Sequence, residues 1–202
     1  MHNSKFVQDY CGLFGYVKYS SRLTHRQLFN QKFDAAIKPL NCIHLDLVGP
    51  VVPALVSGFN YILTIVDQST SFKIIKFLKR KSDASNQFSI VKIFMENQKD
   101  WKIKRIVSDQ GGEFLNKHFK DLAEECGITH ILSPAEMPQH NGYAERANRT
   151  ILEKTIYLLG SANLPDLYWA EALSTATLLS NPIPTPSRMN KSPYLLWTNQ
   201  PP

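Results

Sequence analysis

Three acidic residues lie where a carboxylate is either unusual or well placed for chemistry. Asp46 sits inside a predicted apolar strand, although Asp is depleted from strands. Asp109 ends another predicted strand and precedes two glycines, which is where open α/β sheets place their sites. Glu145 begins an amphipathic helix after a polar loop. Each also has an ordinary interpretation: Asp46 could face solvent, Asp109 could form a turn before glycine, and Glu145 could stabilise a helix N-terminus.

Brought together, the three acids would form a site for divalent metal ions. Unpaired carboxylates at close range repel and raise one another's pKa, and a divalent cation removes that penalty. Hard oxygen ligands suit Mg²⁺ or Mn²⁺, and two such ions about 3.5–4 Å apart can hold the attacking and leaving oxygens of a phosphoryl transfer. The sequence shows no Ser/His/Asp or Cys/His triad and no glycine-rich nucleotide loop. Asp46, Asp109 and Glu145 are therefore the candidate catalytic residues and the candidate ligands of two Mg²⁺ or Mn²⁺ ions.

The order of predicted elements shows how these residues could meet. Hydrophobic patterning predicts five strands, at residues 41–48, 59–66, 72–78, 103–108 and 128–132. The short links between the first three indicate an antiparallel meander, and the last two alternate with helices. We therefore expect an α/β fold with a five-stranded mixed sheet and helices on both faces. With the first strand central and the fourth beside it, Asp46 and Asp109 become neighbours, and the helix after the fifth strand lowers Glu145 onto them.

Helical periodicity predicts four helices that would pack around the predicted sheet. Helices are predicted over residues 82–99, 117–125, 142–160 and 167–179, with Asn116 as a cap of the second. An apolar segment at 193–197 is expected to pack back onto the domain. His44 shares a strand face with Asp46 and is expected to be a packed histidine rather than a ligand. The three tryptophans are expected in the core rather than as platforms for nucleic-acid bases: Trp101, Trp169 and Trp197.

Composition limits the class of protein. The chain has 202 residues, of which 43% are hydrophobic, enough for a core of its own. Its formal charge of +6 favours a polyanionic partner. No apolar run approaches the roughly 20 residues that a membrane helix needs, so no membrane partner is expected. Three widely spaced cysteines indicate reduced thiols rather than a disulfide framework: Cys11, Cys42 and Cys126.

Four motifs in order give the chain a specific resemblance. They are His44-Leu-Asp46-Leu-Val-Gly-Pro50, Val66-Asp-Gln-Ser-Thr-Ser71, Ser108-Asp109-Gln-Gly-Gly-Glu-Phe114 and His140-Asn-Gly-Tyr-Ala-Glu145-Arg-Ala-Asn-Arg-Thr150. The chain resembles the catalytic core of a retroelement integrase, closest to those of Copia-type retrotransposons. In that family 35 residues separate the second Asp from the Glu, and 35 residues separate Asp109 from Glu145 here. The resemblance implies three parts: a basic arm at 1–40, a catalytic core at 41–165, and a C-terminal helix and extended tail at 166–202.

The resemblance also implies a fold, a reaction and partners. The fold would be RNase H-like, and the metal magnesium or manganese. The reactions would be 3′-end processing of element DNA and strand transfer into target DNA, by an endonuclease and polynucleotidyl transferase. Double-stranded DNA, further copies of the chain and other parts of the retrotransposon polyprotein would be the partners. The place of action would be the nucleus, reached by way of a cytoplasmic particle.

Contacts with DNA are expected around the predicted helix that begins at Gly142. Asn148 and Arg149 lie one turn beyond Glu145 and would face a phosphate or base at the metals. The loop just before the helix is expected to contribute Gln139, His140 and Asn141, and to settle only when metal and DNA are present. Arg146 is a further candidate, although it fits a solvated helix face equally well.

One departure from the family concerns zinc. An upstream His₂Cys₂ module precedes the family's core, but here Phe14 stands where a second cysteine should follow Cys11, and the His pair is absent. Residues 1–40 are therefore expected to be a remnant without zinc. This departure keeps open a catalytically silent nucleic-acid-binding module from a decayed element. An RNase H-type nuclease, which shares fold and metals, is a further alternative.

Overall fold

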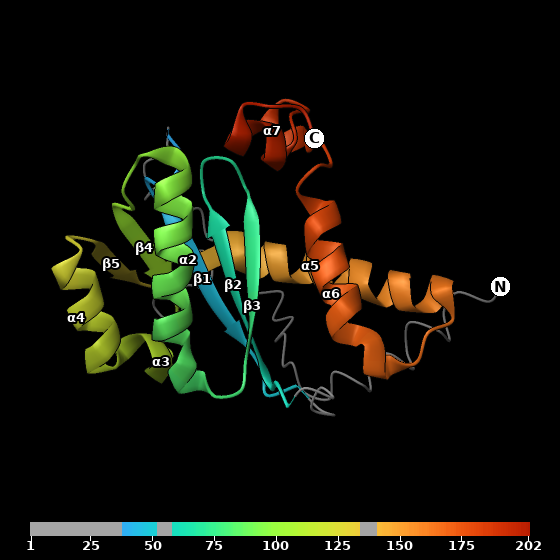
Figure 1. Ribbon diagram of the computed structural model, residues 1–202, viewed down its shortest axis with the longest axis horizontal. Coiled ribbons are helices and arrows are strands. Elements are labelled where there is room, and N and C mark those ends of the chain that lie inside the picture. Colours follow the sequence, from blue (N-terminus) through green and yellow to red (C-terminus); the bar gives the residue numbers. More distant parts are fainter. Residues whose placement is uncertain (1–37, 52–57, 134–140) are drawn as a thin grey trace, which may run out of the picture.

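One mixed sheet of five strands runs through the centre of the protein (Figure 1). The computed structural model describes residues 38–51, 58–133 and 141–202. The strands are β1 (Ile43–Val48), β2 (Tyr61–Asp67), β3 (Lys73–Leu78), β4 (Arg105–Ser108) and β5 (Thr129–Leu132), in the spatial order β3-β2-β1-β4-β5. Strand β1 pairs antiparallel with β2 and parallel with β4. The predicted meander, the central first strand and its neighbour β4 are thus confirmed.

Six helices surround this sheet in the part of the chain that the structure describes. They are α2 (Ala84–Lys99), α3 (Gly112–Leu115), α4 (Lys117–Glu125), α5 (Gly142–Ala162), α6 (Trp169–Ser180) and α7 (Pro193–Thr198), with 3-10 turns η1 (Lys81–Asp83), η3 (Asp166–Tyr168) and η4 (Pro186–Arg188). The predicted cap is confirmed, because the Asn116 side chain accepts a hydrogen bond of 2.8 Å from the Phe119 N–H. The single turn α3 was not predicted. None of the described helices is long and apolar enough to cross a membrane.

The alternation of side chains along β1 builds a separate core on each face of the sheet. Ile43 and Leu45 point into the larger core, which α2, α3 and α4 cover. Val48 points to the opposite face, where α5 and α6 pack (Figure 1). Helices therefore cover both faces, as predicted. Asp46 shares the face of Val48, so the strand presents its one acidic side chain toward α5.

The C-terminal segment belongs to the larger core. Trp197 on α7 is only 1% exposed and stacks on Phe72, with ring centroids 5.0 Å apart. Its indole Nε1 donates to Gln98 Oε1 on α2 over 3.2 Å. The prediction that residues 193–197 pack back onto the domain is confirmed, and Trp169 is buried as well. The prediction is wrong for Trp101, which is 45% exposed just beyond the end of α2.

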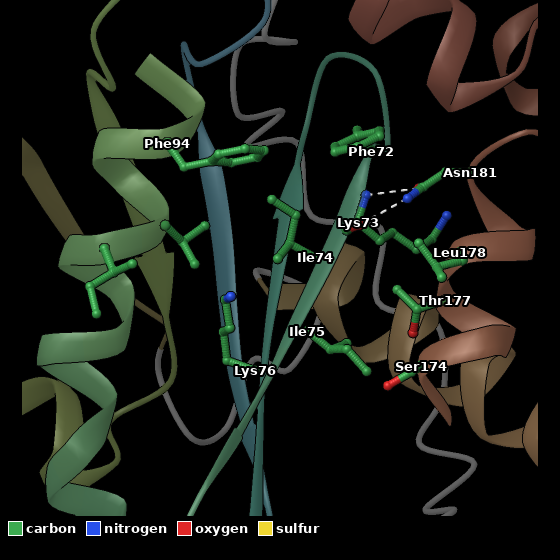
Figure 2. A pocket seen from close by; sticks show the side chains of 12 residues that line it. Phe72, Lys73, Ile74, Ile75, Lys76, Phe94, Ser174, Thr177, Leu178 and Asn181 are labelled. Atoms are coloured by element: carbon green, nitrogen blue, oxygen red, sulfur yellow. Dashed lines mark hydrogen bonds between the residues drawn. The ribbon is translucent and has the colours of Figure 1, made fainter. Parts of the chain in front are cut away.

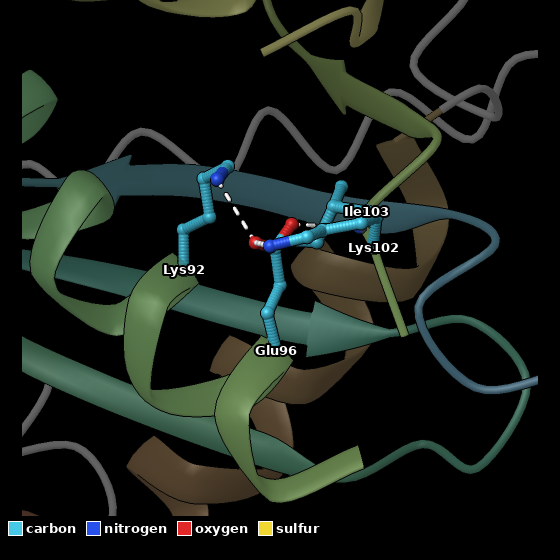
Figure 3. Close-up of polar contacts among 4 residues, drawn as sticks. All are labelled: Lys92, Glu96, Lys102 and Ile103. Carbon is cyan, nitrogen blue, oxygen red and sulfur yellow. Dashed lines mark hydrogen bonds and ion pairs between the residues drawn. The ribbon is translucent and has the colours of Figure 1, made fainter. Parts of the chain in front are cut away.

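A buried carboxylate joins the end of α2 to the segment that leads into β4. Glu96 accepts hydrogen bonds from the Ile103 N–H (2.9 Å), from Lys92 Nζ (3.0 Å) and from Lys102 Nζ (3.1 Å), as Figure 3 shows. Burial alone would raise the pKa of Glu96, but these three donors outweigh it and lower the pKa. Glu96 therefore stays ionised and fixes the approach of β4 to the sheet.

Glu96→Ala is expected to lower the free energy of unfolding by about 2–3 kcal/mol, because it leaves the buried Ile103 N–H without an acceptor. Urea unfolding at pH 7 measures the loss. Lys102→Ala is the matched control: its side chain is 81% exposed, so we expect a loss below about 0.5 kcal/mol. Equal losses in the two variants would show that Glu96 acts only as a surface charge.

Candidate active site

Asp46 is held by a chain of buried polar side chains. The Asn148 amide Nδ2 donates to Asp46 Oδ2 over 2.6 Å, and the Thr64 hydroxyl donates to Asn148 Oδ1. Thr64 and Asn148 are at most 4% exposed, and Thr64 is the register partner of Asp46 on β2. This polar chain ties β2, α5 and β1 together and sets the direction of the Asp46 carboxylate.

Asp109 lies in the open, immediately after β4. Since β4 runs parallel to β1 and pairs with it at His44, the end of β4 delivers Asp109 to the same edge of the sheet as Asp46. Asp109 Oδ1 accepts a hydrogen bond of 3.1 Å from the Gly111 N–H. The turn-forming role that the following glycines suggested is thus present as well. It occupies one oxygen and leaves the exposed carboxylate accessible to a ligand.

Glu145 is half-buried in the first turn of α5, which packs against β1 and β2. Its pKa is raised by burial first and by the negative charge of Asp109, although the neighbouring Arg146 and Arg149 lower it. The pKa of Asp46 is raised to about 6, by burial first and then by Asp109, with a smaller contribution from Glu145. The Asn148 hydrogen bond acts in the opposite direction. Asp109 therefore influences the protonation of both Asp46 and Glu145.

The three acids have the oxygen ligands that a divalent cation prefers, but in this structure they do not form a complete coordination site. None of them takes part in a salt bridge within residues 38–51, 58–133 and 141–202, so their hard oxygen atoms are available. The raised pKa of Asp46 shows that its ionised form is disfavoured, and a bound cation would stabilise that form. Over the same residues, no three His, Cys, Asp or Glu side chains are grouped so that they could hold a metal ion.

Asp46→Asn is expected to stabilise the metal-free protein at neutral pH. A folded-state pKa of about 6, above the ordinary 3.8, means that the folded state binds more protons between these two values. The free energy of unfolding therefore falls as pH rises through this window. Asn removes the buried charge and still accepts from Asn148, so we expect a gain of about 1–2 kcal/mol at pH 7.5 that disappears below pH of about 4. Urea unfolding in chelator at both pH values measures it, and a gain independent of pH would contradict it.

Two asparagines that were predicted to contact DNA are buried and make internal hydrogen bonds in this structure. Asn141 is 3% exposed: its Nδ2 donates to the Leu45 carbonyl oxygen over 2.8 Å, and its Oδ1 lies 3.4 Å from His44 Nδ1. Asn148 is 4% exposed and lies between Thr64 and Asp46, as described above. Buried amides with both polar atoms paired have no free group for DNA. These two residues hold the described structure together here, and their contact with DNA stays a prediction.

The remaining predicted contacts are two exposed arginines and two residues outside the described part of the chain. Arg146 and Arg149 are exposed beside Glu145, and the Arg146 guanidinium lies 5.1 Å from the ring centroid of Tyr143. Gln139 and His140, the loop expected to settle on metal and DNA, and the arm at 1–37 fall outside the described residues. His44 is 3% exposed against Tyr143, which confirms the prediction of a packed histidine.

The role of Asn148 could have been predicted from the sequence, because Asn148 falls within the apolar stripe of the predicted helix. On α5 the buried positions are Gly142, Ala144, Ala147, Asn148, Ile151, Thr155 and Leu159. An amide inside this apolar stripe needs a buried partner, because an unpaired polar group in a core is destabilising. The stripe therefore indicated that Asn148 contacts another buried group of the protein. The prediction of a DNA contact had relied only on its position one turn beyond Glu145.

Comparison with known proteins agrees with this arrangement. Residues 37–138 match the model of the integrase core domain. The chain is 33% identical over 192 residues to the retrovirus-related Pol polyprotein from transposon TNT 1-94 of Nicotiana tabacum, covering 95% of this chain and 14% of the relative. It is 34% identical over 179 residues to the Pol polyprotein from transposon RE2 of Arabidopsis thaliana, covering 89% of this chain and 12% of the relative. The chain thus spans only a small part of these relatives.

Two solved structures share the fold. The chain superimposes on a simian T-cell lymphotropic virus intasome, solved with the PP2A regulatory subunit B56 gamma, with a TM-score of 0.69 at 17% identity, covering 97% of this chain and 68% of that one. It superimposes on the HTLV-2 integrase catalytic core domain, solved with magnesium in a trimeric form, with a TM-score of 0.60 at 19% identity, covering 80% and 98%. The fold is RNase H-like, as predicted. The chain belongs to the integrase core domain family and is a catalytic core of the retrotransposon type.

Proposed function

We propose that this domain is a metal-dependent polynucleotidyl transferase that processes the 3′ ends of element DNA and joins them to target DNA. The observation that carries the proposal is the charge interaction among Asp46, Asp109 and Glu145, together with the family's spacing of 35 residues between Asp109 and Glu145. These carboxylates come from a central strand, a strand end and a helix, and none of them forms a salt bridge within the described residues. That arrangement suits phosphoryl transfer.

Asp46, Asp109 and Glu145 would hold the Mg²⁺ or Mn²⁺ ions. When bound, the ions would supply activation of water or a DNA 3′-hydroxyl and stabilisation of the leaving oxygen. The HTLV-2 core, which shares the fold, was solved with magnesium, and this supports the choice of cation. In this chain Asn148 would keep the Asp46 carboxylate oriented, because its amide is itself fixed by Thr64. Arg146 and Arg149 would attract phosphates toward the acids.

The proposed partners are double-stranded DNA and further copies of the chain. A formal charge of +6 supports a polyanionic partner. The similar structures were solved as an intasome and as a trimeric core, and joining two DNA ends to a target requires more than one active site. Other parts of a retrotransposon polyprotein would flank the domain, and chromosomal target DNA would place the reaction in the nucleus.

A strand-transfer assay tests the proposal. The protein is mixed with Mn²⁺ and a labelled duplex that carries an element end, and joined products are resolved on a denaturing gel. We expect joined DNA with Mn²⁺ and none with chelator. An RNA–DNA hybrid in a parallel reaction tests the RNase H-type alternative and is expected to remain intact. Salt-dependent DNA binding without joining in any divalent metal would favour the silent binding module.

A further inference from the structure

A second group of cations lines a pocket on a different side of α5 from Glu145. The pocket has a volume of about 410 Å³ and lies where α5, the β2–β3 turn and the η4 turn meet. Tyr143, Arg146, Ala147 and Thr150 line it from α5, at the spacing of one helix face. Lys73, Ser71 and Arg188 line it from the other elements, and we call this hollow the basic pocket.

The basic pocket holds positive charge without a matching negative charge. Its lining includes Lys73, Arg146 and Arg188 but no carboxylate. Within the described residues, none of the three forms a salt bridge. Burial first, and then the charges of Lys154 and Arg188, lower the pKa of Lys73 to about 8. Like charges are thus gathered in a partly dry place, which is unfavourable unless an anion joins them.

The acids that interact with these cations, Asp67 and Glu145, do not line the pocket. Asp67 interacts with the charge of Arg188, but its carboxylate already accepts from the Leu40 N–H and from both the N–H and hydroxyl of Thr70. Glu145 interacts with Arg146, but it belongs to the acidic site with Asp109. Both acids reduce the local positive charge, but among the described residues neither lines the pocket nor forms a salt bridge with its cations.

Neutral partners hold the cations in place. Lys73 Nζ donates to the Ser71 carbonyl oxygen over 3.2 Å, and Arg188 Nε donates to Ser71 Oγ over 3.1 Å. A second Arg188 nitrogen donates to the Gln68 carbonyl oxygen. The backbone of Lys73 is fixed in turn by Asn181, which accepts from its N–H and donates to its carbonyl oxygen (Figure 2). Bonds to neutral oxygens position the charges without cancelling them.

We propose that the basic pocket binds a phosphate group of the DNA backbone. A phosphate oxygen accepts well from guanidinium, ammonium and hydroxyl groups, and the pocket combines all three. The pocket also adjoins the acidic site: Tyr143, which lines it, packs against His44, two residues from Asp46 on β1. A duplex bound at the acids would therefore extend toward this surface. The proposal rests on the proposed function only in taking DNA, rather than a small phosphate compound, as the source.

DNA binding by the full chain with Asp109→Asn, in chelator, tests the proposal apart from catalysis. Fluorescence anisotropy of a labelled duplex is measured between 50 and 200 mM salt, concentrations at which phosphate contacts are strongly salt dependent. Lys73→Gln and Arg146→Gln are each expected to weaken binding about 3–10-fold and to reduce the salt slope by about 0.9. Lys73→Arg, which keeps the positive charge that Lys73→Gln removes, should bind DNA like the parent protein. Lys117→Gln, an exposed cation on α4, is the matched control and is expected to change affinity less than about 2-fold.

A second arm identifies the source of the phosphate. Pyrophosphate is added to the same proteins, and the shift of the thermal unfolding midpoint is recorded. One outcome is that pyrophosphate stabilises the protein only when Lys73 and Arg146 are present, while the variants bind DNA as tightly as the parent protein. That outcome would show that the pocket binds phosphate but would overturn DNA as the source of the phosphate. Pocket variants that match Lys117→Gln in both measurements would overturn the proposal, whether or not the wild-type protein joins DNA. Arg146 is exposed, so its variant keeps the test valid even if Lys73→Gln fails to fold.

Discussion

Asp109→Asn is expected to reduce strand transfer by at least about 100-fold, because Asp109 is a proposed metal ligand and the loss of even an outer-shell partner of a ligand typically costs about 10–100-fold. The substitution keeps the fold, because an Asn oxygen can still accept from the Gly111 N–H as Asp109 Oδ1 does over 3.1 Å. Only the negative charge is lost. The strand-transfer assay with Mn²⁺ measures the effect, and DNA binding in chelator is expected to persist.

A second readout of the same variant is independent of activity. The charge of Asp109 is one of the causes that raise the pKa of Asp46 to about 6, so its removal should lower that pKa. Titration of the Asp46 carboxyl by NMR in metal-free buffer records the change. Glu124→Gln, an exposed acid on α4, is the matched control and should affect neither readout. Full strand transfer by Asp109→Asn would show that the active site has been assigned to the wrong residues.

Trp197→Ala is expected to lower the free energy of unfolding by about 3–5 kcal/mol, the range for removing a large aromatic side chain from a core. The indole is 1% exposed, stacks on Phe72 and is bonded to Gln98. Its loss would leave a cavity beside Phe72 and α2, together with a Gln98 side chain that has lost this hydrogen bond. Urea unfolding followed by tryptophan fluorescence and circular dichroism measures the change.

Two further variants separate packing from hydrogen bonding. Trp101→Ala removes an indole that is 45% exposed, so we expect a loss below about 1 kcal/mol. Trp197→Phe keeps the aromatic stack but not the bond to Gln98, and should cost about 1–2 kcal/mol. If Trp197→Ala were no more destabilising than Trp101→Ala, α7 would be an appendage rather than part of the core.

Local patterning sufficed for the sheet, and it made the three acids stand out as candidates. Alternation along Ile43–Val48 gave both the strand and its two faces, and short links gave the antiparallel pairs. Asp46 was visible because its type disagreed with its surroundings. The turn α3 was not visible, because the four residues Gly112–Leu115 are too few to show a helical period.

Hydrogen bonds between buried polar groups that lie far apart in the chain could not be predicted from the sequence. Thr64 and Asn148 are 84 residues apart, and nothing local to either residue names the other. Glu96 resembles an ordinary acid of a surface helix until the Ile103 N–H and two lysines converge on it. The basic pocket likewise depends on tertiary contact, since Ser71 and Arg188 are 117 residues apart. Such pairs follow from how the layers stack, which hydrophobic periodicity does not fix.

The place of Trp197 has a consequence for how the protein folds during synthesis. The ribosome releases every strand of the sheet before it releases α7, and the bond between Trp197 and Gln98 spans 99 residues. Until that residue emerges, the nascent chain has a sheet whose larger core is open to water beside Phe72. Contacts of long sequence separation form late and leave such surfaces exposed to aggregation. We therefore expect chaperones that recognise apolar surfaces to bind this edge of the nascent domain and to release it when α7 docks.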